Sequence, residues 1–442
     1  MNIFALSSGK GPSGIAIIRL SGKGTKKISQ SIVKQNSLNS KKINLCKFYN
    51  PKNNQLIDEG LLLWFPGPNS FTGEDLTEFH IHGSNAVIRQ FLKILSEQKE
   101  CRLAEPGEFT KIAFQNNKID LLKAESIADL IHSETEMQRQ QAINLLQGNA
   151  SKYYSNLREK LIKSLSYIEA KIDFAEDDLS SDVLKEVHKS ILNVHADIKK
   201  ILEDDKVGEK IREGFRVSIV GEVNAGKSSL LNLLSKREVA IVSSEKGTTR
   251  DVIEAYLNID GYPVILSDTA GIRDVKNEVE KKGIKLAIKK LQESDLNIIM
   301  IDNTSTKINA KIKSLINENS IIVLNKSDIN NVQKRNVGKV DNILISVKKN
   351  KNIDKLIKLI KSKLSSKFAT SGNVLITRER HRNKLNACLK EIDNFLKKDC
   401  NKDIEIAAED LRMATRHLGS IVGRVDVEEI LGSIFKDFCI GK

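Results

Sequence analysis

The sequence is poor in cysteine, proline and aromatic residues, and it contains no long apolar run. Its 442 residues include six prolines, one tryptophan and only 5% aromatic residues. No run approaches the roughly 20 apolar residues that span a bilayer, and no basic region precedes an apolar stretch at the N-terminus. Neither a membrane protein nor a secretory leader is therefore expected. The five cysteines fit neither a disulfide framework nor a zinc spacing, which favours a reducing, cytoplasmic compartment: Cys46, Cys101, Cys388, Cys400 and Cys439.

The chain has an excess of basic residues. It has 71 Lys and Arg against 57 Asp and Glu, a formal net charge of +14. Such a surface attracts phosphate backbones. The abundance of Lys, Asn and Ile is also typical of an AT-rich genome, so an RNA partner and a compositional bias both remain open.

Residue periodicity divides the chain into segments of different type. Residues 1–118 mix short apolar runs with Gly and Pro, which indicates a compact unit of helices and strands. Apolar residues recur at steps of three and four in 119–210 and again in 368–442, which predicts helices. Strand-like runs alternate with helical stretches in 211–367, which predicts a mainly parallel sheet. The simplest organisation is an α/β domain inserted into a helical domain.

The segment GEVNAGKS at 221–228 matches the phosphate-binding motif G-x-x-x-x-G-K-[ST]. It follows an expected strand and precedes a helical stretch, which is the context that this motif requires. Backbone N–H groups of the loop and the helix N-terminus would bind phosphates. Lys227 would reach the β and γ phosphates, and Ser228 would ligate magnesium.

Further short motifs follow in the order typical of a GTPase. DTAG at 268–271 would place Asp268 near magnesium and the N–H of Gly271 near the γ-phosphate, while GTTRD at 247–251 offers Thr249 as a switch threonine. NKSD at 325–328 offers the Asp328 carboxylate to two donors that guanine has and adenine lacks, and SVK at 346–348 would contact the base edge. The ordered set at strand ends predicts a GTP site.

The residue after DTAG is Ile272, where many small GTPases have the glutamine that orients water. Either hydrolysis is slow, or other groups replace that glutamine. Asn224 offers an oxygen that could hold a monovalent cation against the phosphates. Glu280 could orient water, although a solvated charge on a helix face is the alternative.

At this point the chain resembles the MnmE (TrmE) family of bacterial and organellar tRNA-modification GTPases. The resemblance covers nearly the whole length and rests on WFPGPNSFTGED (64–75), PGEFTKIAFQNNKIDLLKAESIADLI (106–131), NAGKSSLLN (224–232), AIVSSEKGTTRDV (240–252), DTAGIR (268–273) and the closing FCIGK.

The resemblance implies a multidomain fold with α/β and all-α parts. It has an N-terminal α+β domain for tetrahydrofolate binding and dimerisation (1–118), a helical domain (119–210 and 368–442, ending in Cys-Ile-Gly-Lys) and an inserted Ras-like P-loop G domain (211–367). It also implies a cytoplasmic homodimer that works with the flavoprotein MnmG. The complex adds an aminomethyl or carboxymethylaminomethyl group to C5 of the wobble uridine of certain tRNAs.

The resemblance also assigns ions and a cofactor to particular residues. Magnesium would be held by Ser228 and Thr249, and Glu280 would orient the water. The potassium ligands would be Asn224, Ser243, Glu245 and Thr248. The reduced folate, 5-formyl- or methylene-tetrahydrofolate, would be bound by Arg19, Glu78, Lys118 and Lys442. The residues expected to contact GTP are Asn224, Ala225, Gly226, Lys227, Ser228, Ser229, Ser243, Ser244, Glu245, Lys246, Gly247, Thr248, Thr249, Asp268, Thr269, Ala270, Gly271, Asn325, Lys326, Ser327, Asp328, Ser346, Val347 and Lys348.

Several interpretations stay open on sequence alone. Cys439 stands fourth from the end of the sequence, the position of the cysteine in a prenylation signal, but Gly441 and Lys442 do not suit such a signal. It is either a buried packing residue or a thiolate in the modification chemistry. His80 and His82 could share a metal on one strand face, but no further ligands are evident, so structural histidines are favoured. The alternative function is a GTP-gated, RNA-binding switch of ribosome assembly.

Overall fold

The computed structural model divides into two compact units. The first unit comprises residues 1–128, 146–180 and 394–442, and the second comprises 129–145 and 181–393. The structure describes residues 1–9, 11–40, 42–173, 181–222, 224–237, 254–268, 291–305, 310–329, 337, 340–367, 374–399, 403–425, 431, 434–435 and 438–441.

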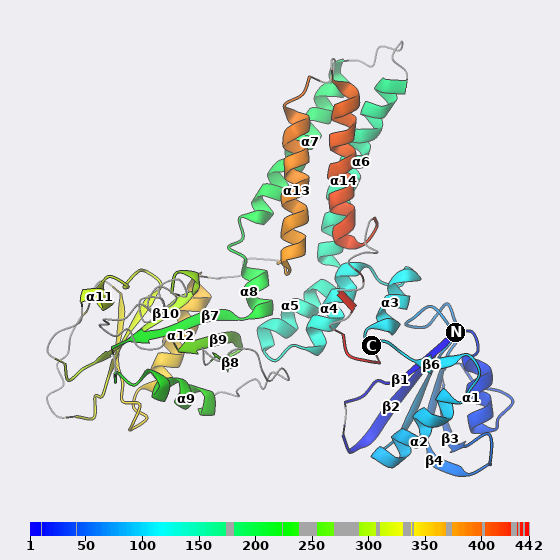
Figure 1. Ribbon diagram of the computed structural model, residues 1–442. Helices are drawn as coiled ribbons and strands as arrows, with labels where there is room; N and C mark the ends of the chain where they lie inside the picture. The colour runs from blue at the N-terminus through cyan, green and yellow to red at the C-terminus, as the bar shows by residue number, and fades with distance from the viewer. Residues whose placement is uncertain are drawn as a thin grey trace, which may run out of the picture. The chain divides into compact units, whose positions relative to one another are not determined.

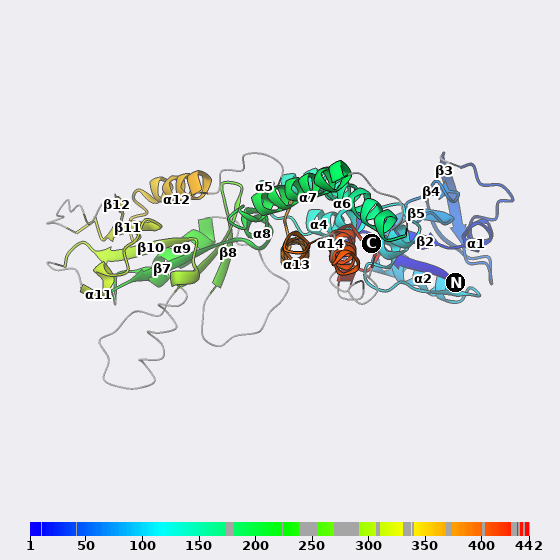
Figure 2. The same ribbon diagram turned by 90° about the horizontal axis from the view of Figure 1, so that it is seen from above.

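A six-stranded sheet with two covering helices forms the N-terminal part of the first unit (Figure 1). All neighbouring strands are antiparallel except β1 and β6. The helices α1 (Thr25–Val33) and α2 (Asn85–Ser96) pack on one face (Figure 2). In spatial order the strands are β3 (Ile43–Tyr49), β4 (Leu56–Phe65), β5 (Leu76–Gly83), β2 (Ser13–Ser21), β1 (Asn2–Leu6) and β6 (Cys101–Leu103).

Alternation along the strands determines which residues meet the helices. Phe79 and Ile81 on β5 join the buried cluster under α1 and α2, while Glu78 and His80, which alternate with them along the strand, face the other side of the sheet. Phe79 packs edge-on against Phe48 at a centroid distance of 5.9 Å. These features confirm the α+β class expected for this part of the chain.

The helices of the first unit are amphipathic, as their periodicity predicts. Besides α1 and α2, the helices that lie wholly or mostly in this unit are α3 (Glu108–Gln115), α4 (Leu121–Ile131), α6 (Asn149–Asp173) and α14 (Ile404–Val422). Helix α14 packs along α6. Leu157 and Leu161 of α6 and Leu411 and Leu418 of α14 are buried at the expected helical steps.

The second unit is built around a six-stranded, mainly parallel sheet. Only β8 and β9 run antiparallel, and β8 is a strand that the periodicity did not predict. In spatial order the strands are β12 (Asp341–Leu344), β11 (Ser320–Asn325), β10 (Leu296–Asp302), β7 (Phe215–Gly221), β9 (Tyr262–Asp268) and β8 (Glu254–Ile259).

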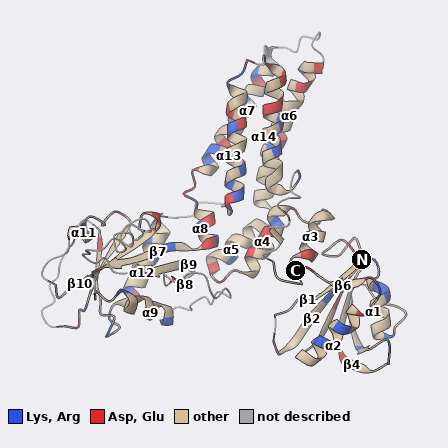
Figure 3. Cartoon of the chain, in the orientation of Figure 1, with Lys and Arg blue, Asp and Glu red and all other residues tan. Residues whose placement is uncertain are grey.

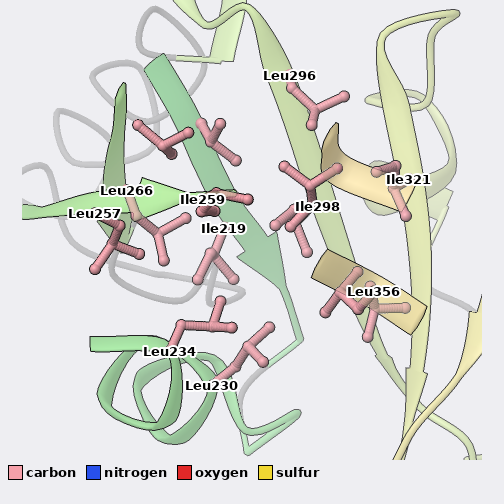
Figure 4. Packing of buried hydrophobic residues seen from close by; sticks show 14 of the residues in the cluster. Ile219, Leu230, Leu234, Leu257, Ile259, Leu266, Leu296, Ile298, Ile321 and Leu356 are labelled. Atoms are coloured by element: carbon pink, nitrogen blue, oxygen red, sulfur yellow. The ribbon is translucent and has the colours of Figure 1, made fainter. Parts of the chain in front are cut away.

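Helices on both faces bury this sheet. Helices α9 (Lys227–Arg237) and α12 (Ile353–Lys367) share one apolar cluster with the strands, in which Leu230, Leu234 and Leu356 meet Ile219 and Ile298 (Figure 4). Helix α11 (Ala310–Lys313) packs on the other face. Continuous apolar strands are typical of a parallel sheet covered on both sides.

The remaining helices of the second unit are α5 (Glu136–Leu146), α7 (Ser181–Leu202), α8 (Val207–Glu213) and α13 (Glu379–Leu396). Helix α8 leads directly into β7. Across the described parts of the chain, no helix combines the length and apolar character needed to cross a membrane.

Candidate functional site

The segment matching the phosphate motif connects β7 to α9 in the second unit. Gly226 has a φ of 96°, and a Cβ there would lie 2.5 Å from Nδ2 of Asn325. Glycine is therefore required both for the backbone conformation and for this close approach. Asn325 uses the space to donate a hydrogen bond to the Ala225 carbonyl at 2.8 Å. The loop is thus fixed to the end of β11.

Lys227 begins α9 and points back into the loop. Its Nζ donates to the carbonyls of Gly221 at 3.2 Å and Glu222 at 2.8 Å, and the residue is only 8% exposed. Burial lowers the pKa of Lys227, although the charge of Asp268 opposes this effect. An ammonium group held in this way beside a strand end and a helix N-terminus suits a polyphosphate.

Ser228 and Asp268 meet beside the loop. The Ser228 hydroxyl donates to Oδ2 of Asp268 at 2.6 Å, whereas Oδ1 of Asp268 is buried and has no hydrogen-bond partner among the described residues. A hydroxyl and a carboxylate with a spare oxygen are the ligands that magnesium prefers when phosphates complete its shell. The residues present therefore fit a magnesium ion.

The ends of β11 and β12 form a second polar cluster at the same edge of the sheet. Oδ1 of Asn325 accepts from the backbone N–H of Val347 at 3.1 Å, and the Ser346 hydroxyl donates to Asp328 at 2.5 Å. The Ser346 hydrogen bond is the main cause that lowers the pKa of Asp328. Asp328 is thus presented as an ionised acceptor, which suits the two N–H donors of a guanine edge. The adjacent Lys326 pairs with Asp302 at 2.5 Å.

Three residues expected to bind a reduced folate surround one loop of the first unit. Arg19 on β2 and Glu78 on β5 lie opposite each other and form an ion pair of 2.8 Å. The ring of Phe71 lies 5.7 Å from the Arg19 guanidinium. Lys118 passes over Gly73, where a Cβ would lie 3.0 Å from its Cε. The loop at 71–73 thus lies next to Arg19 through Phe71 and next to Lys118 through Gly73.

The two histidines of β5 have local partners. His82 Nδ1 lies 2.7 Å from Asp58, and His80 Nε2 lies 3.5 Å from Glu78. Within the described residues, no group of three or more His, Cys, Asp or Glu side chains could hold a metal ion. Each histidine thus has a carboxylate neighbour in the N-terminal sheet.

The C-terminal segment is attached to the N-terminal sheet within the first unit. Ile440 pairs with Pro106, the Cys439 carbonyl accepts from Gly107 N–H at 3.4 Å, and the Gly441 carbonyl accepts from the Ser7 hydroxyl at 2.9 Å. The Cys439 side chain itself is exposed. The interpretation of Cys439 as a buried packing residue is therefore wrong, because Phe435 and Phe438 fill the apolar contact instead.

Comparison with known proteins decides the family. The model of the MnmE helical domain matches residues 121–439, and the model of the TrmE N-terminus, described as a GTP-binding protein, matches residues 2–118. The tRNA modification GTPase MnmE of Pelagibacter ubique is 58% identical over 100% of both chains. This chain belongs to the MnmE family.

Other MnmE relatives match over a similar extent. The MnmE of Rickettsia bellii is 42% identical, covering 100% of this chain and 99% of its own. The mitochondrial tRNA modification GTPase gtpbp3 of Dictyostelium discoideum is 38% identical, covering 100% of this chain and 95% of its own. Both the bacterial and the organellar branches of the MnmE family are thus represented.

Part of the expected MnmE-type site lies outside the residues that the structure describes. These residues are Ser243, Ser244, Glu245, Lys246, Gly247, Thr248, Thr249, Thr269, Ala270, Gly271, Glu280 and Lys442. Among the described ones, Asn224 is exposed and has a φ of 64° at the outer side of the phosphate loop. Ser229 follows on the exposed face of α9.

Sequence reasoning missed two features of these sites. Phe71 covers Arg19, and its place in the motif WFPGPNSFTGED was the only signal that could have indicated it. Ser7 holds the C-terminal segment, although a serine near the N-terminus carries no sign of a partner more than 400 residues away. Such long-range pairs are decided by the fold.

Proposed function

We propose that this MnmE-family chain hydrolyses GTP in a potassium-stimulated reaction. The observation that carries the proposal is the convergence of Lys227, the Ser228–Asp268 pair and Asp328 at one edge of the parallel sheet. These groups bind a polyphosphate, a divalent ion and a guanine edge, respectively. The family named for tRNA modification GTPases supports the same activity.

The residues of the site have separate roles in this reaction. Lys227 holds the β and γ phosphates, and Asp328 selects guanine. Ser228 and Thr249, with Asp268 nearby, would hold magnesium, which would supply positive charge against the phosphates. Potassium would be held by the Asn224 side chain, which the structure leaves exposed, together with Ser243, Glu245 and Thr248. Glu280 orients the attacking water in place of the missing glutamine.

The N-terminal sheet and the C-terminal segment are proposed to bind a reduced folate. Arg19 and Lys118 are basic groups that suit its carboxylates, and Glu78 accepts from a pterin. The backbone contacts of Cys439 and Gly441 attach these two residues beside this sheet, and Lys442 is proposed as a further ligand. The exposed Cys439 is available to take part as a thiolate.

We infer that two chains associate through their N-terminal domains. The face of the sheet opposite α1 and α2 carries Glu78 and also exposes large apolar side chains. Ile15, Ile43 and Leu45 are 64%, 71% and 69% exposed. Exposed apolar residues gathered on one sheet face are typical of a protein interface. A homodimer through this face would enclose the Arg19–Glu78 pair.

In the cell, the dimer is proposed to act in the cytoplasm with MnmG on tRNA. Together they add an aminomethyl or carboxymethylaminomethyl group to C5 of the wobble uridine, with the one-carbon unit taken from the folate. The domains proposed for this work remain 1–118 for folate and dimerisation, 119–210 with 368–442 for the helical domain, and 211–367 for the inserted G domain.

Two measurements test this function. GTPase rates are compared in potassium and sodium buffers, with and without MnmG, and a higher rate in potassium is expected. Equal rates would remove the potassium role. Nucleosides of tRNA from a deletion strain are then analysed with and without the restored gene. We expect the wobble uridines to lack the modification in the deletion strain and to regain it when the gene is restored. Wobble uridines that stay modified in the deletion strain would favour a ribosome-assembly switch.

A further inference from the structure

Two arginines of the first unit meet at one glycine of α14. A Cβ on Gly419 would lie 3.0 Å from Nε of Arg158 on α6, and the backbone N–H of Arg424 donates to the Gly419 carbonyl at 2.9 Å. Glycine is unfavourable inside a helix, but here it leaves room for the Arg158 side chain against α14. Burial, and then the positive charge of Arg424, lower the pKa of Arg158.

Among the described residues, neither guanidinium has an acidic partner. Nε of Arg158 is buried and has no hydrogen-bond acceptor among these residues. Across the part of the chain that the structure describes, neither arginine forms an ion pair, and Glu159 acts on Arg158 only as a nearby charge. A buried donor without an acceptor and two neighbouring like charges both cost free energy. An anion bound between the two guanidinium groups would offset the repulsion between their charges.

An arginine within α14, Arg412, differs from this pair because it has carboxylate partners. Arg412 pairs with Glu169 of α6 at 2.5 Å and also with Glu409. Acidic and basic residues are interspersed along α6 and α14 (Figure 3). Among the described residues, carboxylates thus pair with Arg412, whereas none pairs with Arg158 of α6 or with Arg424, which follows the end of α14.

We propose that Arg158 and Arg424 bind a backbone phosphate of the RNA substrate. Guanidinium groups donate in a planar fork that matches phosphate oxygens, and two of them can share one phosphate. Arg424 is exposed and therefore within reach of a macromolecule. The net charge of +14 favours such a polyanion. This site positions the RNA and does not read its bases. It rests on the proposed function in tRNA modification.

The test compares tRNA binding of the full-length chain and its variants over a range of KCl concentrations. Fluorescence anisotropy with a labelled, unmodified tRNA transcript gives the affinity and its salt dependence. Arg424→Ala is expected to weaken binding about tenfold and to make the salt slope shallower by about one unit. Arg424→Lys should keep most of the slope. Arg412→Ala also removes one positive charge, but from an arginine that is paired with carboxylates. It should leave the tRNA affinity and the salt slope unchanged.

Thermal unfolding separates a binding role from a structural one. Without bound RNA, the Arg424 charge repels that of Arg158, so Arg424→Ala should melt at the wild-type temperature or above it. Arg412→Ala loses two ion pairs and should melt at a lower temperature. Wild-type affinity and slope in Arg424→Ala would overturn the proposal, as would a wild-type chain that does not bind tRNA. Weaker binding of 5-formyl-tetrahydrofolate polyglutamate in equilibrium dialysis, with unchanged tRNA binding, would assign the arginines to the folate instead.

The same variants are assayed for GTP hydrolysis without tRNA. Unchanged rates are expected, because neither arginine belongs to the nucleotide site. A wild-type chain without GTPase activity would contradict the proposed function and leave the RNA contact to be judged by the anisotropy data alone.

Discussion

Asp328 is the residue on which the choice of nucleotide depends. Its carboxylate accepts from two guanine donors, and an amide in its place would present N–H groups to them. Hydrogen bonds to charged groups contribute about 1.5–3 kcal/mol each, so we expect Asp328→Asn to reduce GTP affinity at least about tenfold. Xanthine nucleotides, which carry a carbonyl at that position, should bind relatively better.

Fluorescence titration with labelled nucleotides measures this change. Asp354→Asn is the matched control, because Asp354 is an exposed aspartate of the same unit that pairs with Arg237. An unchanged ratio of guanine to xanthine affinity in Asp328→Asn would contradict the role of Asp328.

Ser346 should control the pH range over which this carboxylate works. The Ser346 hydroxyl is the main cause of the lowered pKa of Asp328, so the carboxylate stays ionised to a lower pH than usual. GTP binding is therefore present above this pKa and is lost as the pH falls through it. Ser346→Ala should raise the pKa of Asp328. GTP affinity should then begin to fall at a higher pH than in the wild type.

Titrations of GTP affinity between about pH 7 and pH 3.5 check this shift, since unperturbed Asp titrates near 3.9. Ser366→Ala is a suitable control, because that hydroxyl bonds only to the Lys363 carbonyl in its own helix. Coincident pH midpoints in the wild type and Ser346→Ala would disprove the effect.

At the scale of single elements, the C-terminal segment carries the exposed cysteine Cys439, whereas the other described cysteines are buried or partly buried. Burial raises the pKa of Cys46, raises the pKa of Cys101 to about 11 and raises that of Cys388. Thiolates are the reactive form, so native-state alkylation with iodoacetamide should modify Cys439 first. Cys400→Ser is used as the background, since Cys400 lies outside the described residues.

Peptide mass spectrometry after short exposure reads the order of labelling. The Gly441→Ala variant should label faster at Cys439, because a Cβ at φ 100° would clash with the Leu6 carbonyl and release the segment. Equal labelling of Cys439 and Cys388 in the native protein would contradict the placement of this segment.

Periodicity predicted most elements but not all of them. Leu157 and Leu161 are buried as their helical spacing predicts, because one face of α6 must leave water. The strand β8 was not predicted, because its alternation is short and its antiparallel partner β9 follows it immediately in the sequence. Edge strands depend on a neighbour for their hydrogen bonds, so sequence alone indicates them weakly.

At the scale of the whole molecule, ion pairs join segments of the second unit that are distant in sequence. Arg382 on α13 pairs with Glu209 of α8 at 2.7 Å and with Asp204 at 2.6 Å, and its side chain is only 11% exposed. Breaking a buried pair leaves an unpaired charge and costs about 3–5 kcal/mol. We expect Arg382→Ala to lower the free energy of unfolding by this amount.

Urea denaturation followed by circular dichroism measures that loss. Arg139→Ala is the control, because the exposed Arg139–Glu136 pair lies within one helix of the same unit and should contribute little. A wild-type midpoint for Arg382→Ala would show that the pairs between α8 and α13 do not stabilise the unit.

The sequence by itself determined the GTPase motifs, the fold class and the family, because phosphate loops, strand ends and amphipathic faces depend on local spacing. Only the tertiary structure decided that Asn325 holds the phosphate loop, that Ser7 holds the chain's end and that Arg158 lies unpaired beside Gly419. Each of these joins residues about 100 or more positions apart, and no local pattern encodes which distant backbone will fill a given space.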